Sequence, residues 1–293
     1  MDSVILILQI VAPVFLVVAM GAGWIWLGQD FPVEFVTRFA TKLAVPALIV
    51  VVLMQSELSS AAVTEMFFAS IAGYVALLIV FAGFCVVFGL AIRTYLAPLG
   101  FGNTGNLGLP LCLFAFGETG LEFAVVVFAV TSVLSFSVGI GLVSGKWSLR
   151  RLLSEPIFLG TVIGVALLYS DIHTPDWMTR FLELVGQMAI PLVLVTLGAS
   201  LARLTGQFFL KAAGLSILKI GMAVCIGWMV SRAFGLSGVA QSVLIVQLST
   251  PVAVTSFMLA KLYGSEPDQV ATLVITSTIL SVLTLPFLLA FLV

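Results

Sequence analysis

The chain has 293 residues, of which 61% are hydrophobic and only 9% are charged. Soluble domains are about 45–50% apolar and about 25% charged, so this composition excludes a soluble enzyme and a disordered chain. The formal net charge of −1, without a basic cluster, also excludes a nucleic-acid-binding protein. The 3 cysteines and the single histidine are too scattered for a disulfide framework, a metal motif or a catalytic triad. The composition indicates a polytopic membrane protein.

A helix that crosses a lipid bilayer needs about 20 mostly apolar residues. Long segments without charged residues recur along the whole chain, and we expect ten spans joined by short loops, with no soluble domain. The predicted spans are 4–28, 35–56, 66–92, 98–116, 120–144, 155–171, 178–202, 208–234, 238–261 and 268–291. The predicted fold class is therefore all-α and integral to the membrane.

The lysines and arginines of the loops predict the orientation of the spans, because basic loops stay in the cytoplasm. With the N-terminus outside, nine basic residues fall on the inner side and two on the outer side, where the loops are acidic instead. We therefore expect a multi-pass protein of the cytoplasmic (inner) membrane with both termini outside.

The two halves of the chain share proline motifs in the same order. The matched motifs are Pro13-Val-Phe-Leu with Pro156-Ile-Phe-Leu, Ala44-Val-Pro46 with Ala189-Ile-Pro191, and Leu109-Pro110-Leu111 with Thr250-Pro251-Val252, at offsets of 143, 145 and 141 residues. Five spans per half is an odd number, so the second repeat must be inverted in the membrane. We expect a first five-helix repeat at 1–145, a cytoplasmic connecting loop at 146–154 and a second, inverted repeat at 155–293. Inverted repeats are typical of secondary transporters, whose substrate site lies at the repeat interface.

Spans four and nine contain helix-breaking polar sequence at matching positions, GNTGNLGLP over 102–110 and QLSTPVAVTS over 247–256. Backbone freed by proline is tolerated at membrane depth where it lines protein or a wet cavity, and the N-termini of half-helices suit an anion. The residues predicted to bind substrate are Asn103, Thr104, Gly105, Asn106, Gln247, Ser249, Thr250 and Thr255. Gly108, Pro110 and Pro251 are predicted to hold the helix breaks. The alternative is a pair of proline kinks whose polar side chains only satisfy neighbouring backbone groups.

Lys219 is the only charged residue well inside a predicted span, between the uncharged segments 212–218 and 220–231. A lysine in lipid is costly, so this side chain is expected to face the protein interior. It can attract an anionic substrate, stand in for a coupling cation, or donate to the carbonyl groups of a broken helix. The sequence leaves these three roles open, and we include Lys219 among the candidate substrate-binding residues.

These segments resemble the auxin efflux carrier family, in its bacterial form, within the bile/arsenite/riboflavin transporter superfamily. The resemblance rests on GNTGNLGLPL in span four, AVPALIV and AIPLVLV in spans two and seven, LVTLGASL at the end of span seven, ILKI with Lys219 in span eight, and the polar break in span nine. It implies that the broken helices four and nine cross, with the substrate beside the crossing. It also implies a scaffold of spans one, two, six and seven, a moving core formed by the other spans, and a homodimer.

We therefore predict a secondary transporter that moves a small organic anion, such as a mono- or dicarboxylate, by alternating access with an elevator-like movement of the core. A sodium-coupled symporter of the bile-acid type is the alternative, and proton or sodium coupling both stay open. An intramembrane enzyme is the less favoured class, because the chain has neither HExxH nor GxSG with a membrane-embedded histidine. We expect no cofactor, no bound metal and no nucleic-acid partner.

Overall fold

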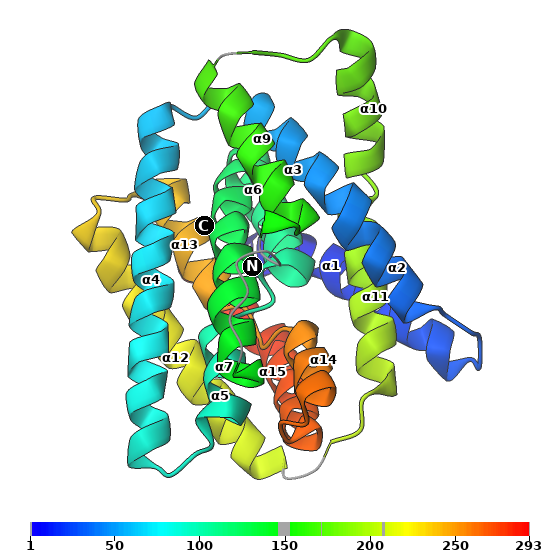
Figure 1. Ribbon diagram of the computed structural model, residues 1–293, viewed down its shortest axis with the longest axis vertical. Helices are drawn as coiled ribbons and strands as arrows, with labels where there is room; N and C mark the ends of the chain where they lie inside the picture. Colours follow the sequence, from blue (N-terminus) through cyan, green and yellow to red (C-terminus); the bar gives the residue numbers. More distant parts are fainter. Residues whose placement is uncertain (1, 146–152, 171, 207–208, 293) are drawn as a thin grey trace.

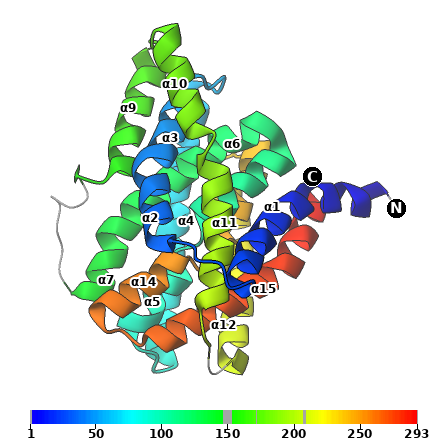
Figure 2. The same cartoon turned by 90° about the vertical axis from the view of Figure 1, so that its right-hand side faces the viewer.

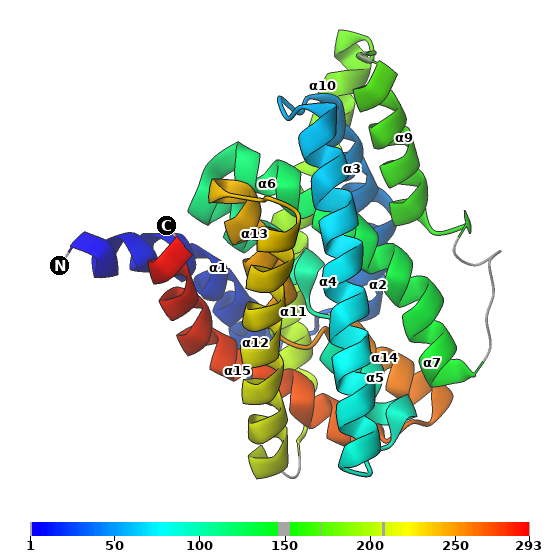
Figure 3. The same ribbon diagram turned by 90° about the vertical axis from the view of Figure 1, so that its left-hand side faces the viewer.

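The computed structural model describes residues 2–145, 153–170, 172–206 and 209–292, and most of the connecting loop expected at 146–154 lies outside them. Within these ranges the fold is helical, and β-type pairing is limited to one isolated bridge. Figures 1, 2 and 3 show α4 and α12 packed together on one side of the molecule, with α2, α3, α10 and α11 on the other. The α-helices are α1 (Asp2–Trp26), α2 (Val33–Phe39), α3 (Val45–Met54), α4 (Ser60–Val87), α5 (Ile92–Gly100), α6 (Leu109–Leu134), α7 (Ile140–Ser144), α9 (Pro156–Ser170), α10 (Asp176–Gly186), α11 (Ala189–Arg203), α12 (Phe209–Ala233), α13 (Gly238–Leu248), α14 (Val254–Tyr263) and α15 (Pro267–Leu292). Three π-helical segments are η1 (Ala40–Ala44), η2 (Thr104–Gly108) and η3 (Ser135–Gly139).

In the described part of the chain, seven helical stretches are long and apolar enough to cross a membrane, and α9 and α13 are shorter apolar helices. The longest stretch runs over 41 residues from Thr104 to Ser144, which is far more than one crossing requires. Gly117 divides this stretch, because its backbone (φ 66°, ψ −157°) lies outside the helical region. Residues with a Cβ atom rarely adopt such positive φ angles, whereas glycine adopts them readily, so this turn requires a glycine. The turn lies between the predicted spans four and five.

Both ends of the third predicted span are wrong, as is the start of the fourth, predicted at 98, because α5 begins at Ile92. We expected a span at 66–92, because Glu65 interrupts the uncharged segment, whereas α4 begins at Ser60 and ends at Val87. The helix begins where Ser59 caps it, since the Ser59 hydroxyl accepts a hydrogen bond from the Ala62 N–H at 3.2 Å. It ends two residues before Gly89, which has a positive φ of 62°. Capping therefore sets the ends of α4, and Glu65 lies within its second turn.

Two of the π-helical segments end two residues before a proline, η1 before Pro46 and η2 before Pro110. Proline lacks an N–H, and its ring clashes with the carbonyl group four residues earlier. A wider turn before the proline accommodates both effects without ending the helix. The stretches Val33–Met54 and Thr104–Ser144 therefore continue through Pro46 and Pro110 without a break at either proline.

Close helix packing joins α1 to α11 and α3 to α9. A Cβ atom added to Gly21 of α1 would overlap the backbone carbonyl of Val195 on α11. A Cβ atom added to Gly164 of α9 would lie 3.2 Å from the carbonyl oxygen of Ile49 on α3. Small residues are what allow helix backbones to approach so closely within a membrane. These two helix pairs form the frame beside which the broken helices lie.

Candidate functional site

The two predicted helix breaks meet in space. Helical backbone ends at Gly100 and resumes at Thr104 in the first break, and it ends at Leu248 and resumes at Val254 in the second. Gly102 and Val252 form an antiparallel bridge between these two stretches. Asn103 N–H donates to the Pro251 carbonyl oxygen at 2.7 Å, which ties the breaks together. Two segments about 150 residues apart in sequence thus form one site.

Lys219 of α12 lies at this meeting point. Its side chain is only 1% exposed, and its ammonium group donates to the Thr250 carbonyl oxygen at 2.6 Å. The Thr250 hydroxyl in turn donates to the carbonyl oxygen of Gln247 at 2.7 Å. The contact made by Lys219 is the one expected of a lysine that supports the broken helix. Because an ammonium group has three donors, this bond does not use up its capacity.

Ser277 of α15 completes the second break, and the sequence did not reveal this residue. The Val252 N–H donates to the Ser277 hydroxyl oxygen at 3.0 Å. Many serines and threonines occur in apolar segments of this chain, and most of those described bond to the carbonyl of their own preceding turn. No local pattern distinguishes Ser277 from them. Only the tertiary contact identifies its role.

Several buried polar atoms around the two breaks have no hydrogen-bond partner in the described structure. They are Asn103 Nδ2, Ser249 Oγ, and both Nε2 and Oε1 of Gln247. These side chains are 4%, 1% and 0% exposed, respectively. Gln247 lies against Gly108, since a Cβ atom added there would overlap its side-chain oxygen. Buried polar groups are nearly always paired in proteins, so an unpaired set points to a ligand or water.

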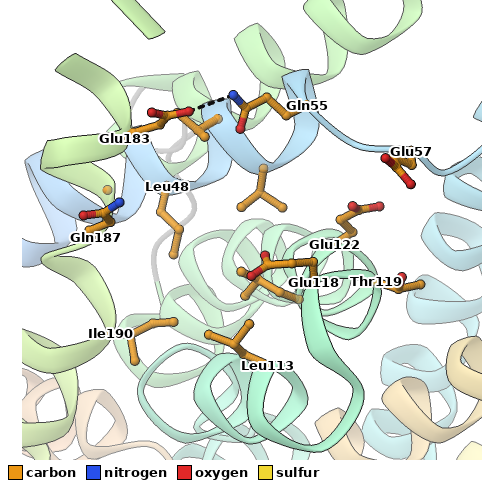
Figure 4. Close-up of a pocket in the computed structure, with 14 residues that line it drawn as sticks. Leu48, Gln55, Glu57, Leu113, Glu118, Thr119, Glu122, Glu183, Gln187 and Ile190 are labelled. Carbon is orange, nitrogen blue, oxygen red and sulfur yellow. Dashed lines mark hydrogen bonds between the residues drawn. The ribbon is translucent and has the colours of Figure 1, made fainter. Parts of the chain in front are cut away.

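A cavity of about 650 Å³ lies between α3, α10 and the turn in α6. Figure 4 shows four carboxylates around it, and no lysine or arginine is among its lining residues. These carboxylates belong to Glu57, Glu118, Glu122 and Glu183. Gln55 Nε2 donates to Glu183 at 2.8 Å, and the Ser56 hydroxyl donates to Glu122 at 2.7 Å. We call this space the acidic cavity.

A second cavity, of about 700 Å³, lies between α2, α11 and α14. Arg203 and Lys261 line it, together with Glu34, which forms an ion pair with Arg38 at 2.6 Å. Val254, the first residue of α14 after the second break, also lines this cavity. The cavity therefore extends from the charged end of α11 to the edge of the site. We call it the basic cavity.

Comparison with known proteins identifies the class of protein to which the chain belongs. Residues 140–289, just over half of the chain, match the family described as membrane transport protein. The chain belongs to this family. The transporter is 29% identical over 195 residues to an uncharacterized transporter of Methanocaldococcus jannaschii, an alignment that covers 62% of each chain. It is 25% identical over 207 residues to a protein of Rhizobium meliloti named "Putative malonate transporter", covering 64% of this chain and 63% of the relative.

The chain thus spans less than two thirds of the length of either relative. Both relatives are named as transporters, and the family is one of transporters and not of enzymes. The resemblance to the auxin efflux carrier family that the motifs carried is therefore confirmed at the level of the family.

Most of the predicted site residues of this transporter are brought together at the two breaks. Thr104, Thr250, Gly108, Pro110 and Pro251 are buried, whereas Gly105 and Asn106 are partly exposed. Thr255 differs from the rest, because its side chain is exposed in the first turn of α14.

Proposed function

We propose that this transporter is a secondary carrier that moves a small organic anion, such as a mono- or dicarboxylate, by alternating access. The observation that carries the proposal is the set of unpaired buried groups on Asn103, Gln247 and Ser249. Leaving such groups without a partner costs about 1–3 kcal/mol each, and a bound ligand removes that cost. The transported anion is the ligand that we assign to them.

The ends of the half-helices support an anionic substrate. One helical segment begins at Thr104 directly after the first break, and α14 begins at Val254 directly after the second. Helix N-termini present unpaired N–H donors and a partial positive charge, which favour carboxylates. The free donors of Lys219 add positive charge near Thr250. The relative named for malonate supports a carboxylate substrate as well.

The proposal includes ten spans in two inverted repeats. The close helix contacts support it. A glycine of the first half approaches a carbonyl group of the second half, and the matching glycine of the second half approaches a carbonyl group of the first half. Gly21 and Gly164 are 143 residues apart, and the carbonyl groups that they approach, on Val195 and Ile49, are 146 apart. A twofold relation between the repeats produces this exchange. The proposal places α1, α3, α9 and α11 in a static scaffold and the broken helices in a core that moves in an elevator-like manner.

The proposed carrier is a homodimer in the inner membrane, with both termini outside and the loop 146–154 in the cytoplasm. The excess of lysine and arginine in the inner loops supports this orientation. Accessibility labelling of a cysteine introduced at position 148, in intact cells, tests it. Labelling of that cysteine by an impermeant reagent added outside contradicts the proposed orientation.

A thermal-shift screen of the purified transporter tests the substrate class. Mono- and dicarboxylates are added with and without sodium and at several pH values. A ligand that binds only the folded state at 100 times its Kd stabilises it by about 2.7 kcal/mol, which is a clear shift in Tm. Stabilisation that requires sodium would favour the bile-acid symporter type of mechanism. A panel in which no carboxylate raises the Tm contradicts the proposal.

Matched variants link binding to the breaks. We expect Asn106→Ala and Gln247→Met to reduce the shift caused by a carboxylate. Gln241→Met is the control, because Gln241 lies on the same helix as Gln247 but is partly exposed. Uptake of the same carboxylate into proteoliposomes should fall in the first two variants and not in the control. Wild-type uptake in all three variants would place the site elsewhere.

A further inference from the structure

The acidic and basic cavities occupy equivalent places in the two halves of the chain. Leu113 lines the acidic cavity and Val254 lines the basic one, and they are 141 residues apart, as are Pro110 and Pro251. Each cavity therefore adjoins the half-helix that follows one of the two breaks. Gln55 and Ser200, which also line the two cavities, are 145 residues apart, the offset of the Ala-Val-Pro and Ala-Ile-Pro motifs.

The two equivalent cavities carry opposite charge. Four glutamates line the acidic cavity without any lysine or arginine. In the basic cavity the one lining carboxylate, on Glu34, is paired with Arg38 at 2.6 Å, and Arg203 is paired with Asp30 at 3.6 Å. The positive charge of Lys261 is therefore left in excess. Arg203 donates to the Phe31 carbonyl oxygen at 2.8 Å. Lys261 is exposed and has no hydrogen bond or ion pair within the described part of the chain.

From this contrast we propose that the site takes up its anionic substrate with higher apparent affinity through the basic cavity, where Lys261 concentrates the anion. The acidic cavity opposes anions on the other side. The inference rests on the proposed function, since it assumes an anion that binds at the two breaks. A cavity lined by one sign of charge focuses the electric field and raises the local concentration of counter-ions about 10–10³-fold.

The effect is kinetic and does not change the overall equilibrium of transport. Positive charge at one entrance lowers the apparent KM on that side, and negative charge at the other raises it. Salt weakens both effects, because the Debye length falls from about 10 Å at 0.1 M to about 3 Å at 1 M. In the proposed orientation, the side with the lower KM is the cytoplasmic side.

Single cysteines can measure the field in each cavity without any substrate. Met258 is 43% exposed in the basic cavity, and Gln187 is exposed in the acidic cavity. We suggest Met258→Cys and Gln187→Cys in a Cys225→Ser background, since Cys85 and Cys112 are buried. Each thiol is modified in detergent by a sulfonate and by a trimethylammonium methanethiosulfonate reagent. The ratio of the two rates reports the local potential.

We expect the ratio of sulfonate to trimethylammonium rate to be at least about tenfold higher at position 258 than at 187 in low salt. The difference should nearly vanish at 1 M salt. Lys261→Gln should lower the ratio at position 258, and Lys261→Arg should keep it. Equal ratios in the two cavities, or a ratio that Lys261→Gln leaves unchanged in a folded protein, would overturn the inference.

Transport in proteoliposomes of known orientation extends the test, with malonate as the probe. We expect the apparent KM on the basic side to rise about threefold or more in Lys261→Gln, with little change on the acidic side. Glu118→Gln should lower the KM on the acidic side instead. A wild-type protein that does not carry malonate contradicts the proposed function, whereas malonate transport with equal KM on both sides contradicts only this inference.

Discussion

The backbone groups that each helix break leaves without a helical hydrogen bond find different partners in the two breaks. The first break, over 101–103, uses the main chain itself, because the Asn103 carbonyl oxygen accepts from the N–H groups of Leu107 and Gly108 at 3.1 Å each. The second break, over 249–253, depends on side chains from two other helices, Lys219 and Ser277. The second break also has main-chain bonds, from the Thr250 N–H to Gln247 at 3.4 Å and from the Ser256 N–H to Ala253 at 3.0 Å, so the side chains of Lys219 and Ser277 add to the backbone there.

A pair of residues separated by the offset of the Ala-Val-Pro and Ala-Ile-Pro motifs illustrates this difference. Tyr74 and Lys219 are 145 residues apart and lie on α4 and α12. The ring of Tyr74 stacks on Phe101, at the start of the first break, with 6.1 Å between the ring centres. Lys219 instead donates a charged hydrogen bond to the second break. The first half thus supports its break by apolar packing, and the second half by a buried charge.

Among the substitutions that test this difference, replacing Lys219 should change the unfolding free energy most. Lys219→Met keeps the unbranched apolar part of the side chain but leaves the buried Thr250 carbonyl without its donor. Loss of a hydrogen bond to a charged group costs about 1.5–3 kcal/mol, so we expect unfolding free energy to fall by that amount. Unfolding in a mixed-detergent titration measures it. Tyr74→Phe is the matched control, because it keeps the stacked ring and should cost less.

Binding of a carboxylate to Lys219→Met separates the roles that the sequence left open. If the free donors of Lys219 also meet the substrate, the variant that still folds should bind carboxylates weakly. If the lysine only supports the break, affinity should be preserved while stability falls. We expect both losses, and unchanged affinity would remove Lys219 from the substrate site.

Forcing the two breaks apart should have the next largest effect. A Cβ atom added to Gly102 would overlap the Thr250 hydroxyl and lie 3.0 Å from its carbonyl oxygen. Over-packing of this kind costs about 1–3 kcal/mol, so Gly102→Ala should lower the Tm and reduce transport. Gly83→Ala is the control, because a Cβ atom there meets nothing within 4 Å. Equal Tm values in the two variants would show that the breaks are not in tight contact.

Removing an unpaired buried group should have a smaller effect, in the opposite direction. Gln247 is fully buried, and neither of its side-chain polar atoms has a partner in the described structure. Gln247→Met should therefore raise the unfolding free energy by about 1 kcal/mol in the absence of substrate, while it weakens substrate binding. Thermal unfolding with and without a carboxylate measures both quantities. A loss of stability in the substrate-free protein would mean that Gln247 has a structural partner.

Much of the helical organisation could be predicted from the sequence, because apolar composition and helix breakers are local signals. The predicted span 268–291 differs from α15 by one residue at each end. The glycine-rich segment and Pro251 indicated where the two breaks lie, whereas Gly108 and Pro110, which were expected to hold the first break, lie inside the helical stretch that follows it. The ends of α4 could not be predicted from charge alone, because the Ser59 cap and Gly89 set them.

The partners within the site could not be predicted, because they depend on tertiary contacts. The sequence identified Lys219 as buried in a span, but not that it contacts the Thr250 carbonyl oxygen, 31 residues away. It identified acidic loops, but not that Glu57 and Glu183 line one cavity. Loop charge predicts which side of the membrane a residue faces, whereas a cavity depends on how helices from both halves pack.

The smallest predicted effect concerns Ser277, the second side chain that supports the proline break. Ser277→Ala removes the acceptor of the buried Val252 N–H, which should cost about 0.5–1.5 kcal/mol. Ser281→Ala is the matched control, because the Ser281 hydroxyl is equally buried but donates only to Thr278 of its own helix, at 2.7 Å. We expect Ser277→Ala to lower the unfolding free energy more than Ser281→Ala, and its effect to add little once Lys219 has been replaced, since both side chains hold the same short segment. Fully additive losses in the double variant would show that the second break is held at two independent points.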